Sequence, residues 1–271
     1  MSLKSPNFFM VAFLMFCSIQ AQNFQGVATY KSHRKVDLKM DESLENVELN
    51  KQLQEQLSKQ FQREYTLKFN QHESVYKQNE QLDAPSPASS GGIKIVVAQG
   101  SDILYKNIKE NRYANQTEMF GKQFLIKDTL NNRNWELVNE TKNIGVYTCF
   151  KATLTEEIKT QTISNEGMET LTKQRTTSAW YTPQIPINNG PDDFFGLPGL
   201  ILEINDGELT LVCTKIVLNP DEELEINEPK KGKEVNQKEF DDIREKKNKE
   251  MMENFQSERG DGKRTIIKIG G

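Results

Sequence analysis

The chain has 271 residues, a net charge of −4 and an isoelectric point near 5.5. This acidic balance leaves no basic footprint for nucleic acid, so we expect no nucleic-acid partner. Hydrophobic residues make up 35% of the chain and charged residues 27%, which predicts one moderate core together with long solvated segments.

The first residues have the pattern of a secretory signal peptide. Lys4 precedes an apolar run from Phe8 to Ile19, and Gln20-Ala21 follows it. A run of about a dozen residues is too short for a hydrocarbon core that needs roughly 20. We therefore expect cleavage after residue 21, no transmembrane span in the mature chain, and a periplasmic or outer-envelope location. An uncleaved anchor is the alternative.

The next part of the chain changes period twice. Residues 26–30 indicate an opening strand, and residues 65–69 alternate apolar and polar side chains as a strand does. Between them, apolar residues recur every fourth position, which predicts an amphipathic helix. This stripe consists of Leu49, Leu53, Leu57 and Phe61. The proline- and serine-rich run 84–92 predicts a loop.

A meander of strands is expected from Ile93 onward, with turn residues between neighbours. The expected strands are 93–98, 102–107, 112–119, 123–128, 135–138, 147–154 and 172–182. The clearest hairpin joins residues 200–205 to residues 208–218 through Asp206-Gly207, a pair typical of two-residue turns. That register would place Ile204 opposite Leu209, and Cys213 opposite Leu200 on an aliphatic face.

The C-terminal region is highly charged, with fourteen acidic and eleven basic residues between Asp221 and Arg264. A weak apolar stripe predicts a marginal helix flanked by disorder, and a flexible tail is the alternative. The stripe consists of Phe240, Ile243, Met251 and Phe255. Residues 265–269 could return as a short edge strand.

These patterns predict a mainly β fold: a curved antiparallel sheet, either a meander or an open half-barrel, with one N-terminal and one C-terminal helix. We divide the chain into the signal peptide at 1–21, a β-rich domain at 22–220 and the charged region at 221–271.

Catalytic and metal-binding motifs are absent from the sequence. The two histidines, His33 and His72, have no metal-ligand spacing, and there is no nucleophile elbow or phosphate loop. We expect no metal and no cofactor. With Cys17 removed in the signal peptide, Cys149 and Cys213 remain, and they could form a disulfide or be ordinary buried residues. A Cys–His dyad and the Asp192-Asp193 pair are weak candidates for catalysis.

The most distinctive segment runs from Trp180-Tyr181-Thr182-Pro183 through Gly190-Pro191 to Phe195–Leu202. With the hexapeptide at 196–201 and an upstream block that begins at Trp135, it resembles the GLPGLI family of exported bacterial proteins. The resemblance covers roughly residues 135–204. It implies an envelope location, and the family has no established activity to carry over.

The same loop can be interpreted physically. Leu197-Pro198-Gly199-Leu200 has proline and glycine where a type II turn favours them. The loop could cap the end of the sheet, or its aromatic residues could line a groove. The candidate binding residues are Trp180, Tyr181, Phe194, Phe195, Leu197, Pro198, Gly199 and Leu200.

We therefore expect an exported, non-catalytic envelope protein that binds a partner protein, a peptide or a lipid-like apolar ligand. One alternative is a periplasmic hydrolase that uses carboxylates or a thiol. The other is a purely structural envelope module, which would show a partner-sized apolar patch.

Overall fold

The computed structural model describes residues 24–34, 62–80, 102–164 and 167–258. Several expected features lie outside these ranges. They are the signal peptide, the helix on the Leu49–Phe61 stripe, the loop at 84–92 and the strands at 93–98 and 265–269.

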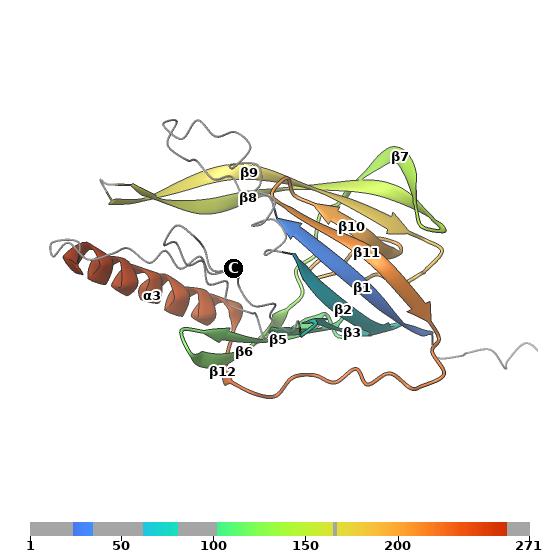
Figure 1. The fold of residues 1–271 in the computed structure, drawn as a ribbon, viewed down its shortest axis with the longest axis horizontal. Coiled ribbons are helices and arrows are strands. Elements are labelled where there is room, and N and C mark those ends of the chain that lie inside the picture. Colours follow the sequence, from blue (N-terminus) through green and yellow to red (C-terminus); the bar gives the residue numbers. More distant parts are fainter. Residues whose placement is uncertain (1–23, 35–61, 81–101, 165–166, 259–271) are drawn as a thin grey trace, which may run out of the picture.

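The described chain is mainly β, as the sequence predicted, with one helix near its C-terminus (Figure 1). The strands are β1 (Gln25–Arg34), β2 (Arg63–Asn70), β3 (Glu73–Gln78), β4 (Ile103–Asn107), β5 (Arg112–Met119), β6 (Lys122–Thr129), β7 (Glu136–Ile144), β8 (Tyr147–Ser164), β9 (Gly167–Thr182), β10 (Leu200–Asn205), β11 (Leu209–Leu218) and β12 (Lys233–Val235). The helix is α3 (Gln237–Glu258).

All twelve strands belong to one sheet, in the order β12-β6-β5-β4-β3-β2-β1-β11-β10-β9-β8-β7. Two antiparallel meanders, β1–β6 and β7–β11, are thus joined where β1 pairs with β11. The sheet bends, so that β6 and the β8–β9 hairpin lie on opposite sides of the picture (Figure 1). The pairing of β1 with β11 brings β1 into the centre of the sheet.

The inner face of the sheet carries the main core. Side chains opposite one another on paired strands share a face, and Leu67, Tyr76 and Leu104 form such a row across β2–β4. They pack with residues of β1, β8, β10 and β11, and with Ile185 and Ile187 from the loop after β9. Residues 183–199 therefore lie against the concave side, and they position the candidate site described below.

The charged C-terminal region covers both faces of the β3–β6 half of the sheet. On the inner face Phe240 of α3 packs edge-to-face on Phe124, with ring centroids 5.4 Å apart. On the outer face Ile226 packs against Tyr105, Ala114 and Leu125. The three residues of β12 pair in parallel with β6. In the described part of the chain, no helix is both long and apolar enough to cross a bilayer.

The β10–β11 hairpin forms, but its predicted register was wrong by two residues. Ile204 pairs with Leu211 and Asn205 with Thr210, so the two turn residues are Gly207 and Glu208 rather than Asp206 and Gly207. Gly207 adopts a φ of 91°, which suits the first central position of a type II′ turn. A shift of two residues keeps every side chain on its face. Cys213 therefore still lies in the aliphatic core.

Candidate functional site

The loop between β9 and β10, residues 183–199, is tied to the sheet by its own backbone. Leu200 N–H donates to Ile185 O at 2.9 Å, and Ile201 N–H donates to Asn189 O at 3.0 Å. The indole N–H of Trp135 donates to Phe195 O at 2.8 Å. These bonds hold the loop against the sheet and against Trp135.

The predicted type II turn at Leu197-Pro198-Gly199-Leu200 was wrong. Gly199 has no positive φ, and its N–H donates to Leu197 O at 2.8 Å. That bond closes a three-residue γ-turn around Pro198. The glycine is required for a different reason, because a Cβ there would lie 2.2 Å from Thr182 O. Close backbone approach, rather than a left-handed turn, explains this position.

Most side chains of the predicted binding loop belong to the core. The buried ones among the eight candidates are Tyr181, Phe194, Phe195, Leu197, Gly199 and Leu200. Trp180 is half-buried and has the Lys142 ammonium 4.3 Å from its ring centroid, while Pro198 is exposed. The aromatic rings therefore pack against the sheet instead of lining an open groove.

A buried lysine anchors the tip of this loop. Lys106 on β4 is fully buried, and its ammonium group donates to Gly190 O at 2.9 Å, Asp192 O at 2.5 Å and Phe194 O at 3.2 Å. Three acceptors match the three donors of the protonated amine. Burial lowers the pKa of Lys106 to about 7, and the carboxylates of Asp193 and Asp192 oppose that shift. The lysine fixes where residues 190–194 lie on the inner face.

Asp192 stands on this anchored tip with a strained backbone. Its φ is 52°, a left-handed value that few residues other than glycine adopt. Part of the residue is open to solvent, but the protein groups around its carboxyl group desolvate it. This desolvation raises the pKa of the carboxyl group to about 6, and the neighbouring Asp193 carboxyl adds to the rise. At neutral pH Asp192 is therefore an anion close to its titration range.

Two tyrosines adjoin this carboxylate on the inner face. Tyr65 and Tyr76 stack with centroids 5.0 Å apart, and the charge of Asp192 contributes to the rise in the pKa of both hydroxyls, which burial chiefly causes. Among the described residues the buried Tyr76 hydroxyl has no hydrogen-bond partner. An unpaired buried hydroxyl calls for an explanation, such as a water molecule or a ligand beside it. We call Lys106, Asp192, Asp193, Tyr65 and Tyr76 the Asp192 site.

Arg133 braces the second carboxylate of the pair. It forms an ion pair with Asp193 and another with Glu156 at 3.5 Å, and its guanidinium lies 4.8 Å from the Phe194 ring centroid. Asp193 is thus neutralised, whereas no ion pair holds the side chain of Asp192 within the described ranges. The two adjacent aspartates have different roles.

The cysteines lie in the hydrophobic cluster that also contains Tyr76 of this site. Cys149 and Cys213 are free, buried thiols in one hydrophobic cluster, and burial raises their pKa values to about 11 and about 12. Such thiols are poor nucleophiles. Neither His33 nor His72 contributes to the pKa shifts of Asp192 or Lys106. Among the described residues no group of acidic, histidine and cysteine side chains could hold a metal ion.

Sequence reasoning identified the two aspartates but missed the groups around them. Lys106 could have been found, because alternation along β4 puts it on the same face as the apolar Leu104. A lysine on an apolar face needs buried acceptors. Nothing in the sequence linked that lysine to a loop more than 80 residues later.

The comparisons with known proteins add little about function. Residues 135–203, which include Trp135 and Asp192, match a family described as "Protein of unknown function (Porph_ging)". No curated protein matches the sequence. Two solved structures of PNGF-II, in space groups C2 and P21, are similar with TM-scores of 0.47 and 0.48 and identities of 14% and 13%. The similarity covers 81% and 82% of this chain but 32% and 33% of those chains, so this protein spans about a third of their length.

Proposed function

We propose that this protein is an exported binding protein of the bacterial envelope, of GLPGLI type over roughly residues 135–204, and that the Asp192 site recognises a polar ligand. The observation that carries the proposal is a single one. Within the described ranges, a carboxylate without an ion pair is held on a strained, anchored loop beside a buried tyrosine hydroxyl that lacks a partner there. The location rests on the signal pattern in residues 1–21.

The chemistry of the site defines what the ligand must offer. The Asp192 carboxylate accepts hydrogen bonds, and the Tyr76 hydroxyl both donates and accepts them. A ligand with hydroxyl or amine donors satisfies both groups, and the stacked tyrosines offer a flat apolar surface at their side. An apolar ligand is less suitable, because the aromatic residues of the loop are already packed in the core.

A carboxylate-dependent hydrolase is the second candidate. One observation favours it, which is that the pKa of Asp192 lies near 6, within the range useful for a general acid or base. Binding is the better supported function, because the neighbouring groups have other tasks. Lys106 is saturated by backbone carbonyls, and Asp193 is neutralised by Arg133.

The test compares native and denaturing masses of the protein purified from its own envelope. Asp192→Asn keeps the shape of the side chain and removes its charge, and Asp221→Asn, in an exposed segment, is the matched control. We expect wild type and Asp221→Asn to carry a discrete small molecule that Asp192→Asn lacks.

Each other outcome has a definite meaning. A native mass equal to that of the bare chain for the wild type would refute ligand binding and favour a structural role. A ligand retained equally by Asp192→Asn would place the site elsewhere. A released molecule that is a cleavage product would support the hydrolase instead.

A further inference from the structure

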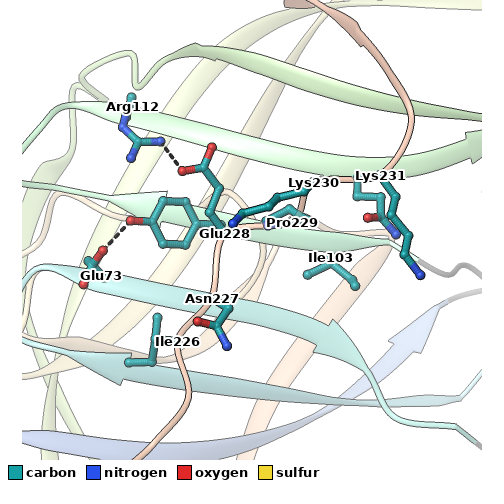
Figure 2. Close-up of a pocket in the computed structure, with 11 residues that line it drawn as sticks. Glu73, Ile103, Arg112, Ile226, Asn227, Glu228, Pro229, Lys230 and Lys231 are labelled. Atoms are coloured by element: carbon teal, nitrogen blue, oxygen red, sulfur yellow. Dashed lines mark hydrogen bonds and ion pairs between the residues drawn. The ribbon is translucent and has the colours of Figure 1, made fainter.

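A second hollow lies on the outer face of the sheet, opposite the Asp192 site. It is an open pocket of about 750 Å³ between β3–β5 and residues 226–231, which we call the strap. Figure 2 shows the strap residues along one side and the strand residues beneath them. The floor consists of Glu73, Ile103, Tyr105, Arg112 and Gln116.

The strap is fixed along its length, so the pocket is preformed. Ile226 packs into the outer-face cluster at one end. Glu228 forms an ion pair with Arg112 at 2.9 Å in the middle. Past the other end, Gly232 with a φ of 118° passes so close to β6 that a Cβ would lie 2.6 Å from Phe124 C. The chain then enters β12 at Lys233, paired with β6. Three tethers make the wall a built feature of the fold.

The acidic groups of the pocket are already engaged. Glu73 accepts a hydrogen bond from the Tyr105 hydroxyl, and Glu228 is neutralised by Arg112. Arg112 is held in turn by Glu110 at 2.6 Å, with its guanidinium 5.4 Å from the Tyr105 ring centroid. Glu73 and Glu228 are therefore both held in place by groups of the protein, although Glu73 keeps its charge and Glu228 shares Arg112 with Glu110.

The basic groups of the strap are not engaged. Lys230 and Lys231 are exposed, and in the described part of the chain neither ammonium group has a hydrogen bond or an ion pair. In Figure 2 the two side chains diverge, Lys230 toward Glu228 and Lys231 away from it, on the side opposite Glu73. The rim of the pocket therefore carries two exposed ammonium groups near the aliphatic side chain of Ile103.

We infer that this pocket binds an amphipathic organic anion, with its acidic group at Lys230 and Lys231 and its apolar body on Ile103 and Pro229. Two lysines supply charge attraction that a carboxylate, sulfonate or phosphate group can use. The volume lies within the range of small-molecule sites, roughly 300–1,000 Å³. The apolar side chains of Ile103 and Pro229 favour an organic body over a bare inorganic anion.

The test uses a fluorescent anion with an apolar body, 8-anilinonaphthalene-1-sulfonate, titrated into the folded full-length mature protein. N-phenyl-1-naphthylamine has the same rings without the sulfonate, and inorganic phosphate is an anion without rings. The double variant Lys230→Ala/Lys231→Ala is compared with Lys109→Ala/Lys122→Ala, which removes the same charge from exposed lysines outside the pocket.

We expect saturable binding of the sulfonate that weakens at least tenfold in Lys230→Ala/Lys231→Ala and changes less than twofold in the control. The uncharged analogue should bind the wild type at least tenfold more weakly than the sulfonate and show no dependence on these lysines. Asp192→Asn should leave sulfonate binding unchanged, which separates this pocket from the Asp192 site.

Three results would overturn the inference. One is equal sulfonate affinity in the two double variants, and another is an absence of saturable binding to the wild type. The third is phosphate that binds as tightly as the sulfonate, which would make the pocket a site for simple anions.

Discussion

Lys106 connects two distant parts of the chain through one amino group. Its three hydrogen bonds to Gly190, Asp192 and Phe194 join β4 to the tip of the loop after β9. Because the acceptors are backbone carbonyls, a side-chain substitution in the loop does not remove them. The position of Asp192 therefore depends on a residue of another strand.

Replacing Lys106 with methionine should destabilise the protein by about 3 kcal/mol, because it leaves up to three carbonyl groups without a donor in a buried setting. The free energy of unfolding in urea measures the loss. Lys109→Met, at an exposed position of the same segment, should change it by less than about 0.5 kcal/mol. Equal stabilities of the two variants would show that the loop does not need this anchor.

Asp192 should make the stability depend on pH between about 4 and 6. Its folded-state pKa is raised to about 6, so over this range the folded protein holds a proton that the unfolded chain releases. The stabilising contribution is present below pH 4 and is lost as the pH rises through 6. Since the residue is exposed, solvent screening limits the effect to about 1 kcal/mol.

Asp192→Asn removes this titration and is the direct check. The unfolding free energies of the wild type and the variant are measured from pH 4 to pH 7. Relative to the variant, the wild type should become less stable as the pH rises. Parallel curves would mean that the carboxyl group titrates normally.

At the scale of the elements, the loop after β9 packs so closely against the end of β9 that no side chain fits at Gly199. Gly199→Ala would force a Cβ to within 2.2 Å of Thr182 O, a backbone atom that cannot rotate away. We expect a loss of about 3 kcal/mol from overpacking. Gly121→Ala is the control, because Gly121 has a φ of 73° in open space. Its cost should be about 1 kcal/mol. Thermal unfolding of both variants gives the comparison, and an equal loss would contradict the packing explanation.

The sequence predicted those elements whose apolar and polar residues alternate. The expected strand at 65–69 lies within β2, where Leu67 and Phe69 are buried, and the expected strand at 26–30 lies within β1, where Ala28 and Tyr30 are buried. By contrast β3 was missed, because Val75 and Tyr76 are adjacent and give no alternation. The expected strand at 147–154 is only the first half of β8, whose second half is rich in threonine and charged residues. Local pattern identifies a strand only where one face is buried.

Contacts between distant residues could not be predicted in the same way. The hairpin at Gly207 had the expected strands but a register set by a type II′ turn, which Asp-Gly composition alone did not distinguish. The Asp192 site brings together residues from β2, β3, β4 and the loop after β9. Its members are joined only by the tertiary fold, so one sequence does not reveal them.

On the scale of the whole molecule, the charged region after Pro220 is part of the folded unit. It contributes the strap, the edge strand β12 and the α3 contact with β6. Deleting residues 221–271 would expose Tyr105, Phe124 and Leu125. We expect a loss of roughly 5 kcal/mol, since each buried apolar side chain contributes about 1.5–3 kcal/mol.

Calorimetry of the truncated chain should show a single transition at least roughly 10 °C below that of the full chain. If the truncated chain fails to fold, Phe240→Ala provides a milder form of the test, because it removes one ring of the α3 contact. An unchanged melting temperature in both variants would mean that the region folds separately from the sheet.

The two margins of the twelve-stranded sheet differ from its interior in a way that affects aggregation. A margin exposes unpaired N–H and C=O groups, which can recruit another chain into a fibril. At one margin β12 covers Phe124–Ile126 of β6. At the other, β7 has a bulge between Val138 and Thr141, and along it lie Glu140, ion-paired with Lys151, and Lys142, ion-paired with Glu203. A short cover and a kinked, charged border are features that oppose edge-to-edge pairing between copies of so wide a sheet.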